Sequence, residues 1–211
     1  MKRIYIVSGN GFARECANLL KHCMGYGKDF IFGGFIGHNG YGALVENPNY
    51  KKSYICDLSD FKLSPDAEFV IGCGDPTLRS IVYEDISTRG GKLVNLIGPH
   101  CVLPDTFELG EGNIFFAPFY GSVDTKIGNC NVFNSDILLG HDVEIGDCNF
   151  FGPRSCCLGS VRVGSLNSFG VGSILLPKVQ VGDGNVISPM SCVYKGCKNG
   201  RRLHGNPALF L

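Results

Sequence analysis

The sequence lacks an excess of charge of either sign. Lysine and arginine total 19, aspartate and glutamate also total 19, and the formal net charge is zero. A protein that binds nucleic acid or a polyanionic membrane through general electrostatics needs a basic surface, and this balance does not supply one. We therefore expect no nucleic acid and no membrane among its partners.

The sequence also lacks a disulfide framework and a metal-ligand pattern. Its eleven cysteines are odd in number and follow no framework spacing, and no hydrophobic signal segment follows Met1-Lys2-Arg3. Zinc requires cysteines and histidines at ligand spacing, and the sequence contains no such set. We expect a reduced, cytoplasmic protein without a bound metal, in which Cys130 and Cys148 pack as small apolar thiols.

The dominant feature that the sequence does contain is an internal repeat with an interval of eighteen residues. A shorter period of six runs within it, marked by apolar residues from Ile97 to Val193 that only Gly121 and Cys157 interrupt. Each coil of such a repeat buries its apolar row only against the neighbouring coils. The longer repeat is visible in five segments: Glu108–Asn113, Lys126–Asn131, Glu144–Asn149, Arg162–Asn167 and Gln180–Asn185.

Three steps of six make one coil, and this arithmetic predicts a triangular prism. Each coil contributes three short strands, the coils stack at about 4.8 Å, and the apolar side chains point inward. Gly and Asn recur in register, and we attribute both columns to corners that need a positive φ. No insertion breaks the register between Leu109 and Val193. An active site must therefore use the faces or corners of the prism, or a groove against a neighbouring subunit.

The first part of the chain follows another pattern, in which expected strands alternate with expected helices. Such alternation predicts a small parallel α/β sheet. A chain of 211 residues suits one or two domains, and the repeat favours two, at residues 1–96 and 97–211. The expected strands cover residues 4–7, 31–36, 69–73 and 92–95, and the expected helices cover residues 12–22 and 76–87.

A glycine turn, Gly9-Asn10-Gly11, joins the first expected strand to the first helix. Such a turn lets a phosphate approach backbone N–H groups at a helix N-terminus, where the helix dipole favours anions. Arg14 replaces the third glycine of the dinucleotide fingerprint, and Gly37-His38 stands where that fingerprint has an acid, which argues against NAD. Two interpretations remain open: a short nucleotide-binding domain, or a tight turn without a ligand.

A second candidate element for the same site follows the strand expected at 69–73. Gly74 and Asp75 stand at the carboxyl end of this strand, and Arg79 follows one helical turn later. The carboxyl ends of parallel strands meet at one edge of a sheet, where ligands bind. We therefore expect these three residues to line the crevice beside the glycine turn.

One histidine is placed to do chemistry. Of the five histidines, only His141 lies within the regular coils, at a predicted corner, and Gly159 occupies the same position one coil later. The absence of a side chain there leaves room for a reacting carbonyl, which the Gly159 N–H can bind while the imidazole takes a proton. Asp142 or Glu144 can hold the second ring nitrogen. The alternative is an inert surface histidine.

The sequence contains five motifs that occur together: Ser8–Glu15, Gly34–Ile36, Ile71–Asp75 with Arg79, Leu139–Asp147 and Gly205–Ala208. In this combination they resemble a family of bacterial sugar acetyltransferases that includes bacillosamine-pathway and perosamine N-acetyltransferases and sialic-acid O-acetyltransferases. The resemblance spans the chain, and its coil region is similar to the hexapeptide-repeat acyltransferases. The implied fold is a small Rossmann-like domain followed by a left-handed parallel β-helix.

The resemblance implies a homotrimer, with acetyl-CoA in the groove between adjacent β-helices and a nucleotide-linked amino sugar reaching in from the N-terminal domain. The catalytic base of the family falls on His141, and the N–H that faces the thioester falls on Gly159. The pantetheine arm runs near Gly170 toward Asn206-Pro207. Basic residues near that end of the chain are candidates for CoA phosphates: Lys195, Lys198, Arg201 and Arg202.

Three departures from the family concern the acceptor and the acetyl group. Gly37-His38 replaces two acidic residues that many relatives carry, Phe150 replaces a second histidine, and Gly98 replaces a histidine usual before Pro99, with His100 displaced beyond it. The predicted reaction is acetyl transfer to the amine of a nucleotide-linked 4-amino-4,6-dideoxy sugar. The alternatives are O-acetylation of a sialic-acid-like sugar, a zinc enzyme similar to γ-carbonic anhydrase, and a non-catalytic trimeric scaffold.

Overall fold

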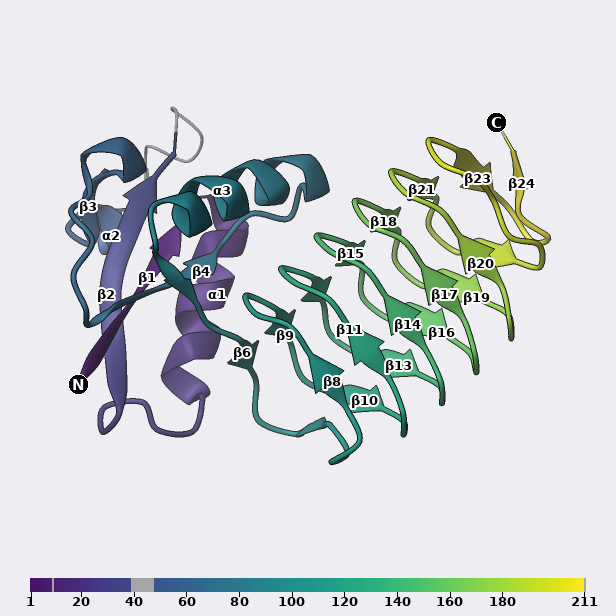
Figure 1. The fold of residues 1–211 in the computed structure, drawn as a ribbon, viewed down its shortest axis with the longest axis horizontal. Coiled ribbons are helices and arrows are strands. Elements are labelled where there is room, and N and C mark those ends of the chain that lie inside the picture. The colour runs from purple at the N-terminus through teal and green to yellow at the C-terminus, as the bar shows by residue number, and fades with distance from the viewer. Residues whose placement is uncertain (9, 39–47, 211) are drawn as a thin grey trace.

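The computed structural model of the chain describes residues 1–8, 10–38 and 48–210. Figure 1 shows a mixed sheet-and-helix part at the N-terminus, followed by a stack of coils that ends near the C-terminus. None of the helices that the structure describes has the length and apolar character needed to cross a lipid bilayer.

The N-terminal part is a parallel sheet with strand order β3-β2-β1-β4-β5, which confirms the predicted parallel α/β arrangement. Successive side chains along each strand point to opposite faces of the sheet. Ile4 and Ile6 pack with helix α1, whereas Val7 and Ile71 pack with helix α3. The elements are β1 (Lys2–Val7), α1 (Gly11–His22), β2 (Phe30–Gly37), α2 (Pro48–Lys51), β3 (Tyr54–Asp57), the 3-10 helix η1 (Leu58–Asp60), β4 (Ala67–Ile71), α3 (Pro76–Thr88) and β5 (Lys92–Leu93).

The coils form three sheets, which we call Face 1, Face 2 and Face 3 of the prism. Face 1 consists of β6 (Leu96–Ile97), β9 (Ile114–Phe115), β12 (Val132–Phe133), β15 (Phe150–Phe151), β18 (Ser168–Phe169), β21 (Val186–Ile187), β23 (Arg202–His204) and β24 (Leu209–Phe210). Face 2 consists of β7 (Cys101–Val102), β10 (Phe119–Gly121), β13 (Ile137–Leu139), β16 (Cys156–Cys157), β19 (Ile174–Leu175) and β22 (Cys192–Val193). Face 3 consists of β8 (Glu108–Leu109), β11 (Lys126–Ile127), β14 (Glu144–Ile145), β17 (Arg162–Val163) and β20 (Gln180–Val181).

The register of these strands confirms the predicted coil. Ile127 pairs with Ile145, and Phe133 pairs with Phe151, eighteen residues later in each case. The pairing is parallel throughout the faces except between β23 and β24. This arrangement is consistent with the left-handed β-helix of acyltransferases that the resemblance implies.

The interior of the prism holds the apolar row with the period of six. Its largest members stack on Face 1, where the rings of Phe151 and Phe169 lie 4.4 Å apart and nearly parallel. Cys157 is buried in this core, so it occupies an inward position of the row like the aliphatic and aromatic residues around it. Ile97, the first member of the row, is an exception because it is exposed at the end of the stack.

The glycine and asparagine columns have a different cause from the one expected. Asn149 does not adopt a positive φ; the preceding residue, Cys148, does. The asparagine side chains instead point inward and form a ladder, in which the Asn149 N–H donates to Asn131 Oδ1 at 2.9 Å. The same ladder joins Asn113, Asn131, Asn149, Asn167 and Asn185, all completely buried.

The glycine column allows close approach of the next coil. A Cβ at Gly146 would lie 2.6 Å from Ser165 Oγ, and this hydroxyl accepts a hydrogen bond from the Asp147 N–H at 2.9 Å. None of the five glycines of this column, Gly110, Gly128, Gly146, Gly164 and Gly182, has a positive φ. The prediction that both columns serve positive-φ corners is therefore wrong. Asparagine recurs because its side chain bonds the backbone of the neighbouring coil, and glycine recurs because a Cβ would collide with that coil.

The N-terminal part packs directly on the outer side of Face 1. Leu96, Ile114 and Val132 point outward from that face and share an apolar cluster with β1 and α1. The expected division at residues 96 and 97 falls inside β6 (Leu96–Ile97), and the Leu96 N–H donates to Asn113 O at 2.8 Å. The two parts are thus continuous in their packing.

Candidate active site

His141 stands in the turn between Face 2 and Face 3. It follows β13, and the turn is closed by Asp142, whose φ is 56°, and by Val143, which is fully buried. The turn exposes the side chain of His141, which retains 63% of its accessible surface. The imidazole is therefore open to a ligand while its backbone is fixed by the coil.

Asp142 holds one nitrogen of the imidazole. His141 Nδ1 lies 2.7 Å from Asp142 Oδ2. When Nδ1 carries the ring hydrogen, it donates to this carboxylate, and Nε2 is left with a free lone pair. Glu144, the other candidate for this role, points from Face 3 and pairs with Arg162 at 3.4 Å. Asp142 alone of the two candidates touches the ring.

Gly159 lies against the other nitrogen, as the eighteen-residue register predicts. A Cβ on Gly159 would come within 2.6 Å of His141 Nε2. The Gly159 N–H has no acceptor within the described part of the chain, whereas its carbonyl accepts from the Lys178 N–H at 3.0 Å. Pro177 occupies the same position one coil later and has no N–H, so the fold does not require a hydrogen bond from this position.

Apart from Gly159, the residues expected to contact acetyl-CoA lie along a different corner, between Face 1 and Face 2. Gly170 packs under Pro189, one coil later, and a Cβ there would lie 2.7 Å from Pro189 Cδ. Asn206 and Pro207 continue the same corner, because the neighbouring Gly205 N–H donates to Ser191 Oγ at 3.1 Å. Within one chain, Face 2 separates these residues from His141.

Part of the expected basic group gathers at the C-terminal end of the coils. Lys198 and Arg201 line a cavity of about 490 Å³ with Gly196 and Cys197. Lys195 and Arg202 are exposed but do not line it. The cavity offers two cations to an anionic group.

In the N-terminal part, the two expected helix N-termini are capped by their own side chains. Asn10 Oδ1 accepts from the Ala13 N–H at 3.0 Å, and Asp75 Oδ1 accepts from the Leu78 N–H at 2.8 Å. Gly74 lies beside Face 1, where a Cβ would be 3.2 Å from the ring of Phe150. Gly9 lies outside the described residues.

A cavity of about 750 Å³ opens between α1 and the first coils. Gly11 and Arg14 line it from α1, and Phe116 and Ala117 line it from the coils. The structure therefore brings two of the expected substrate residues to one cavity at the junction of the sheet and the prism.

Arg79 does not line the crevice. Its side chain is completely buried, and it donates to carbonyl oxygens of Ile71, Cys73, Gly112 and Cys130 at distances from 2.6 to 3.3 Å. Burial lowers the pKa of the guanidinium. The predicted substrate contact of Arg79 is wrong, because a side chain with no accessible surface and four internal acceptors has nothing left for a ligand.

Gly37 is the last residue of β2, His38 follows it, and both lie against side chains of other elements. A Cβ on Gly37 would lie 3.0 Å from the Tyr54 hydroxyl. His38 is buried, and its Nε2 lies 3.2 Å from Asp85 Oδ2. His38 Nδ1 is buried and has no hydrogen-bond partner among the residues that the structure describes. The expected role of His38 as a substrate contact conflicts with this burial.

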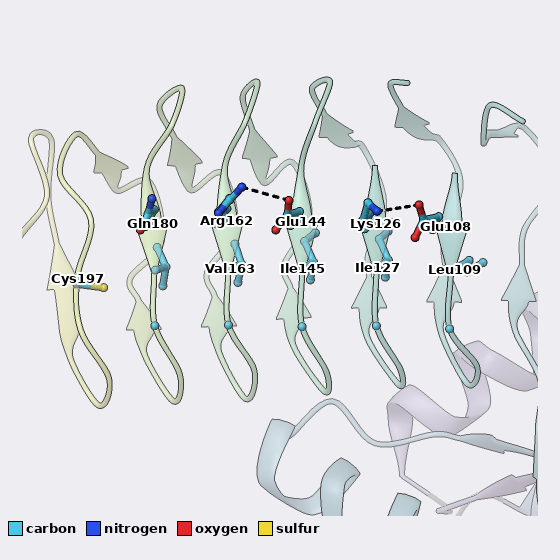
Figure 2. Close-up of a pocket in the computed structure, with 16 residues that line it drawn as sticks. Glu108, Leu109, Lys126, Ile127, Glu144, Ile145, Arg162, Val163, Gln180 and Cys197 are labelled. Atoms are coloured by element: carbon cyan, nitrogen blue, oxygen red, sulfur yellow. Dashed lines mark ion pairs between the residues drawn. The ribbon is translucent and has the colours of Figure 1, made fainter. Parts of the chain in front are cut away.

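Two surface patterns on the prism were not anticipated from the sequence. Figure 2 shows that Face 3 presents a charged row, in which Lys126 pairs with Glu108 at 2.8 Å and Arg162 pairs with Glu144 at 3.4 Å. A shallow hollow of about 820 Å³ runs over these strands along the glycine column. Face 2 instead exposes an apolar row made of Val102, Tyr120, Leu138 and Ile174.

The signal for both rows was present in the repeat. The outward residue stands immediately before each inward residue, so it too recurs every eighteen residues. No cluster of three or more His, Cys, Asp or Glu side chains suited to a metal ion occurs within residues 1–8, 10–38 and 48–210.

The fold is that of bacterial sugar acetyltransferases in which a small N-terminal part precedes a prism of coils. No family model and no curated protein matches the chain. Among solved structures, PerB from Caulobacter crescentus, in complex with CoA and GDP-perosamine, superposes with a TM-score of 0.85 at 24% identity over 100% of this chain and 98% of its own.

Two further structures extend the likeness. The acetyltransferase domain of PglB from Neisseria gonorrhoeae FA1090 matches with a TM-score of 0.85 at 19% identity, and the match covers all of both chains. WeeI from Acinetobacter baumannii AYE matches with a TM-score of 0.79 at 20% identity, again over all of both chains. The resemblance read from the motifs is thus confirmed at the level of the fold.

Proposed function

We propose that the protein transfers the acetyl group of acetyl-CoA to the amine of a nucleotide-linked 4-amino-4,6-dideoxy sugar. The observation that carries this proposal is the arrangement of His141 between the Asp142 carboxylate and the bare backbone of Gly159. The proposal is supported by PerB, which binds CoA and GDP-perosamine, and by the PglB domain, whose structure contains acetyl coenzyme A.

In the proposed reaction the sugar amine attacks the thioester carbonyl directly. The C–N bond forms while the carbonyl oxygen gains negative charge, which the Gly159 N–H stabilises. The amine gives its proton to His141 Nε2, and Asp142 holds Nδ1 and stabilises the imidazolium that results. The C–S bond then breaks, and the proton passes from His141 to the sulfur, so CoA leaves as a thiol without a covalent enzyme intermediate.

The same proposal includes a homotrimer. Face 2 exposes an apolar row, whereas Face 3 is charged and the N-terminal part covers the outer side of the first strands of Face 1, at Leu96, Ile114 and Val132. Apolar surface of this kind is stabilised by burial against another subunit. Packing around Face 2 would bring the His141 corner of one subunit toward the Gly170 and Asn206-Pro207 corner of its neighbour, and acetyl-CoA would lie between them.

The nucleotide-linked sugar is assigned to the carboxyl edge of the N-terminal sheet. The N-termini of α1 and α3 both lie at this edge, and the cavity lined by Gly11 and Arg14 opens beside it. Backbone N–H groups at a helix N-terminus and a guanidinium both suit phosphate oxygens. In this proposal residues 1–96 bind the nucleotide sugar and residues 97–211 bind acetyl-CoA.

The test is a screen of nucleotide-linked amino sugars, GDP-perosamine among them, with acetyl-CoA consumption and product mass as readouts. An acetylated amine on a nucleotide sugar supports the proposal. Acetylation of free sialic acids alone would favour the O-acetyltransferase, which uses the same site. The non-catalytic scaffold is favoured if no acceptor is acetylated and saturating CoA does not raise the thermal midpoint.

A further inference from the structure

Arg79 lies in the seam between the two parts of the chain. Its Nη1 donates to Ile71 O at 2.6 Å and to Cys73 O at 2.8 Å, both at the end of β4 in the N-terminal sheet. Its Nε donates to Cys130 O at 2.7 Å, and its Nη2 donates to Gly112 O at 3.3 Å, both at the corner between Face 3 and Face 1. One guanidinium therefore bonds both parts at once.

The contact is directional rather than ionic. All four acceptors are backbone carbonyls, and no ion pair between the described residues includes Arg79. The planar guanidinium fork fixes the directions of its hydrogen bonds, which a lysine ammonium on a flexible stem does not. Because these carbonyls belong to the backbone, bonds to them fix the position of whole strands and coils and not only of side chains.

The rest of the seam is mainly apolar. Phe12 of α1 lies 5.7 Å from Phe116 and 6.3 Å from Phe150 between ring centres. Such contacts depend on buried area and not on direction, so they hold the two parts together without fixing how one is turned on the other. Asn95, on the connecting segment itself, makes two further directional bonds: its Nδ2 donates to Gly110 O at 2.8 Å, and its Oδ1 accepts from the Asn113 N–H at 2.8 Å.

We propose that Arg79 is a positioning residue that sets the N-terminal sheet relative to the coil that carries His141. Cys130 and His141 belong to the same eighteen-residue coil, and Ile71 and Cys73 lead into the carboxyl edge of the sheet. Arg79 therefore links the edge assigned to the nucleotide with the coil of the assigned base. This inference rests on the proposed function for its catalytic consequence, but the placement itself is a property of the fold.

The test compares Arg79→Lys with Arg89→Lys. Arg89, which caps the C-terminus of α3, also donates to two carbonyls, Leu58 O and Phe61 O, each at 2.6 Å. Both acceptors lie in the N-terminal part, so Arg89 is a matched arginine that bonds only one side of the seam. Both substitutions keep the positive charge and remove the planar guanidinium, which donates several hydrogen bonds in fixed directions.

For Arg79→Lys we expect kcat/KM for the nucleotide sugar to fall about tenfold or more, because misplacing a bound group relative to the reacting centre costs up to ~100-fold in rate. The KM for acetyl-CoA should stay within about twofold, since its assigned contacts all lie in the coils. Arg89→Lys should lower the thermal midpoint and leave both of these kinetic constants unchanged. Equal effects of the two variants on kcat/KM for the nucleotide sugar, or no effect of Arg79→Lys, would overturn the inference.

A second readout does not depend on activity. Amide hydrogen exchange in the whole protein should quicken for Arg79→Lys on both sides of the seam, in α3 and in residues 110–131. For Arg89→Lys it should quicken only in the N-terminal part. Unchanged exchange in residues 110–131 of Arg79→Lys contradicts the inference even if no acceptor is ever acetylated, whereas failure of the acceptor screen with the expected exchange pattern rejects only the proposed function.

Discussion

His141 Nε2 lies against the backbone of Gly159, at a place where a single methyl group would come within 2.6 Å of it. The two residues are eighteen apart and occupy equivalent turns of adjacent coils. The ring thus has a carboxylate on one nitrogen and open backbone on the other.

Replacement of the base is the most direct test. His141→Asn should lower kcat about 100-fold or more, within the range that general bases contribute, while the dissociation constants of CoA and the nucleotide sugar change little. The reason is that asparagine keeps a polar side chain in the turn but accepts no proton. Steady-state kinetics and calorimetric titration measure the two effects. An unchanged kcat rejects the assignment of His141 as the base.

Filling the space at Gly159 should mimic loss of the base without removing it. Gly159→Ala places a Cβ 2.6 Å from Nε2, so the imidazole must move, and kcat should fall about tenfold or more because displacement of a reacting group by about 1 Å is costly. Ser160→Ala, in the same turn, is the control and should retain activity. Equal kcat values for the two variants would show that the space over the ring is not used.

The asparagine ladder should be a main source of coil stability. The Asn149 side chain accepts from the N–H and the amide of Asn167, and donates to Asn131 Oδ1 and Gly164 O. Asn149→Ala leaves buried groups unpaired and should lower the free energy of unfolding by about 2–4 kcal/mol.

Denaturant unfolding measures this loss, and Ser165→Ala is the control. Ser165 Oγ accepts one bond, from the Asp147 N–H, in a half-buried position. Its removal should cost about 1 kcal/mol. A loss for Asn149→Ala no larger than for Ser165→Ala would mean that the buried ladder adds little.

The apolar row of Face 2 should be the subunit interface. Leu138→Glu places a charge in that row and should raise the dissociation constant of the trimer at least about 100-fold, because a buried unpaired charge costs several kcal/mol. Gln180→Glu adds the same charge to the outward row of Face 3 and should leave the assembly intact. Light scattering after gel filtration measures both. A monomeric wild type, or a trimer in Leu138→Glu, contradicts the interface.

Two half-buried thiols should react slowly at neutral pH. Burial raises the pKa of Cys23 and of Cys101 to about 11, from 9.0. The thiolate fraction should then rise about 100-fold between pH 8 and pH 10, against roughly 10-fold for an ordinary thiol. Alkylation rates followed by mass spectrometry measure this. Because the pKa of each thiol is higher in the folded state than in the unfolded state, each thiol contributes to the free energy of unfolding. This contribution is fully present below pH 9 and is lost as the pH rises toward 11.

The position of a residue within a coil could be predicted from the sequence, because residues eighteen apart occupy equivalent places in adjacent coils of a regular repeat. The eighteen-residue interval predicts that Gly159 lies over His141, and the six-residue interval predicts the inward row; the structure shows both. The same reasoning failed for Asn149 and Gly146, because register says which residues stack but not whether a side chain turns inward to bond the backbone of the next coil.

Position outside the coils was harder to predict. Arg79 and His38 stand at strand or helix ends where ligand-binding residues are common, yet both are buried. Their motif positions are local, whereas their burial depends on elements far away in the chain: the corner at Gly112 and Cys130 covers Arg79, and Asp85 of α3 meets His38.

The sequence by itself determined the length of the coil, the composition of its core and the pairing of His141 with Gly159, because each follows from a fixed period along the chain. Only the tertiary structure decided that Arg79 joins the two parts and that Face 2 is the apolar face left open. Burial is set by which surfaces meet, and surfaces distant in the chain meet only once the sheet has packed on the prism.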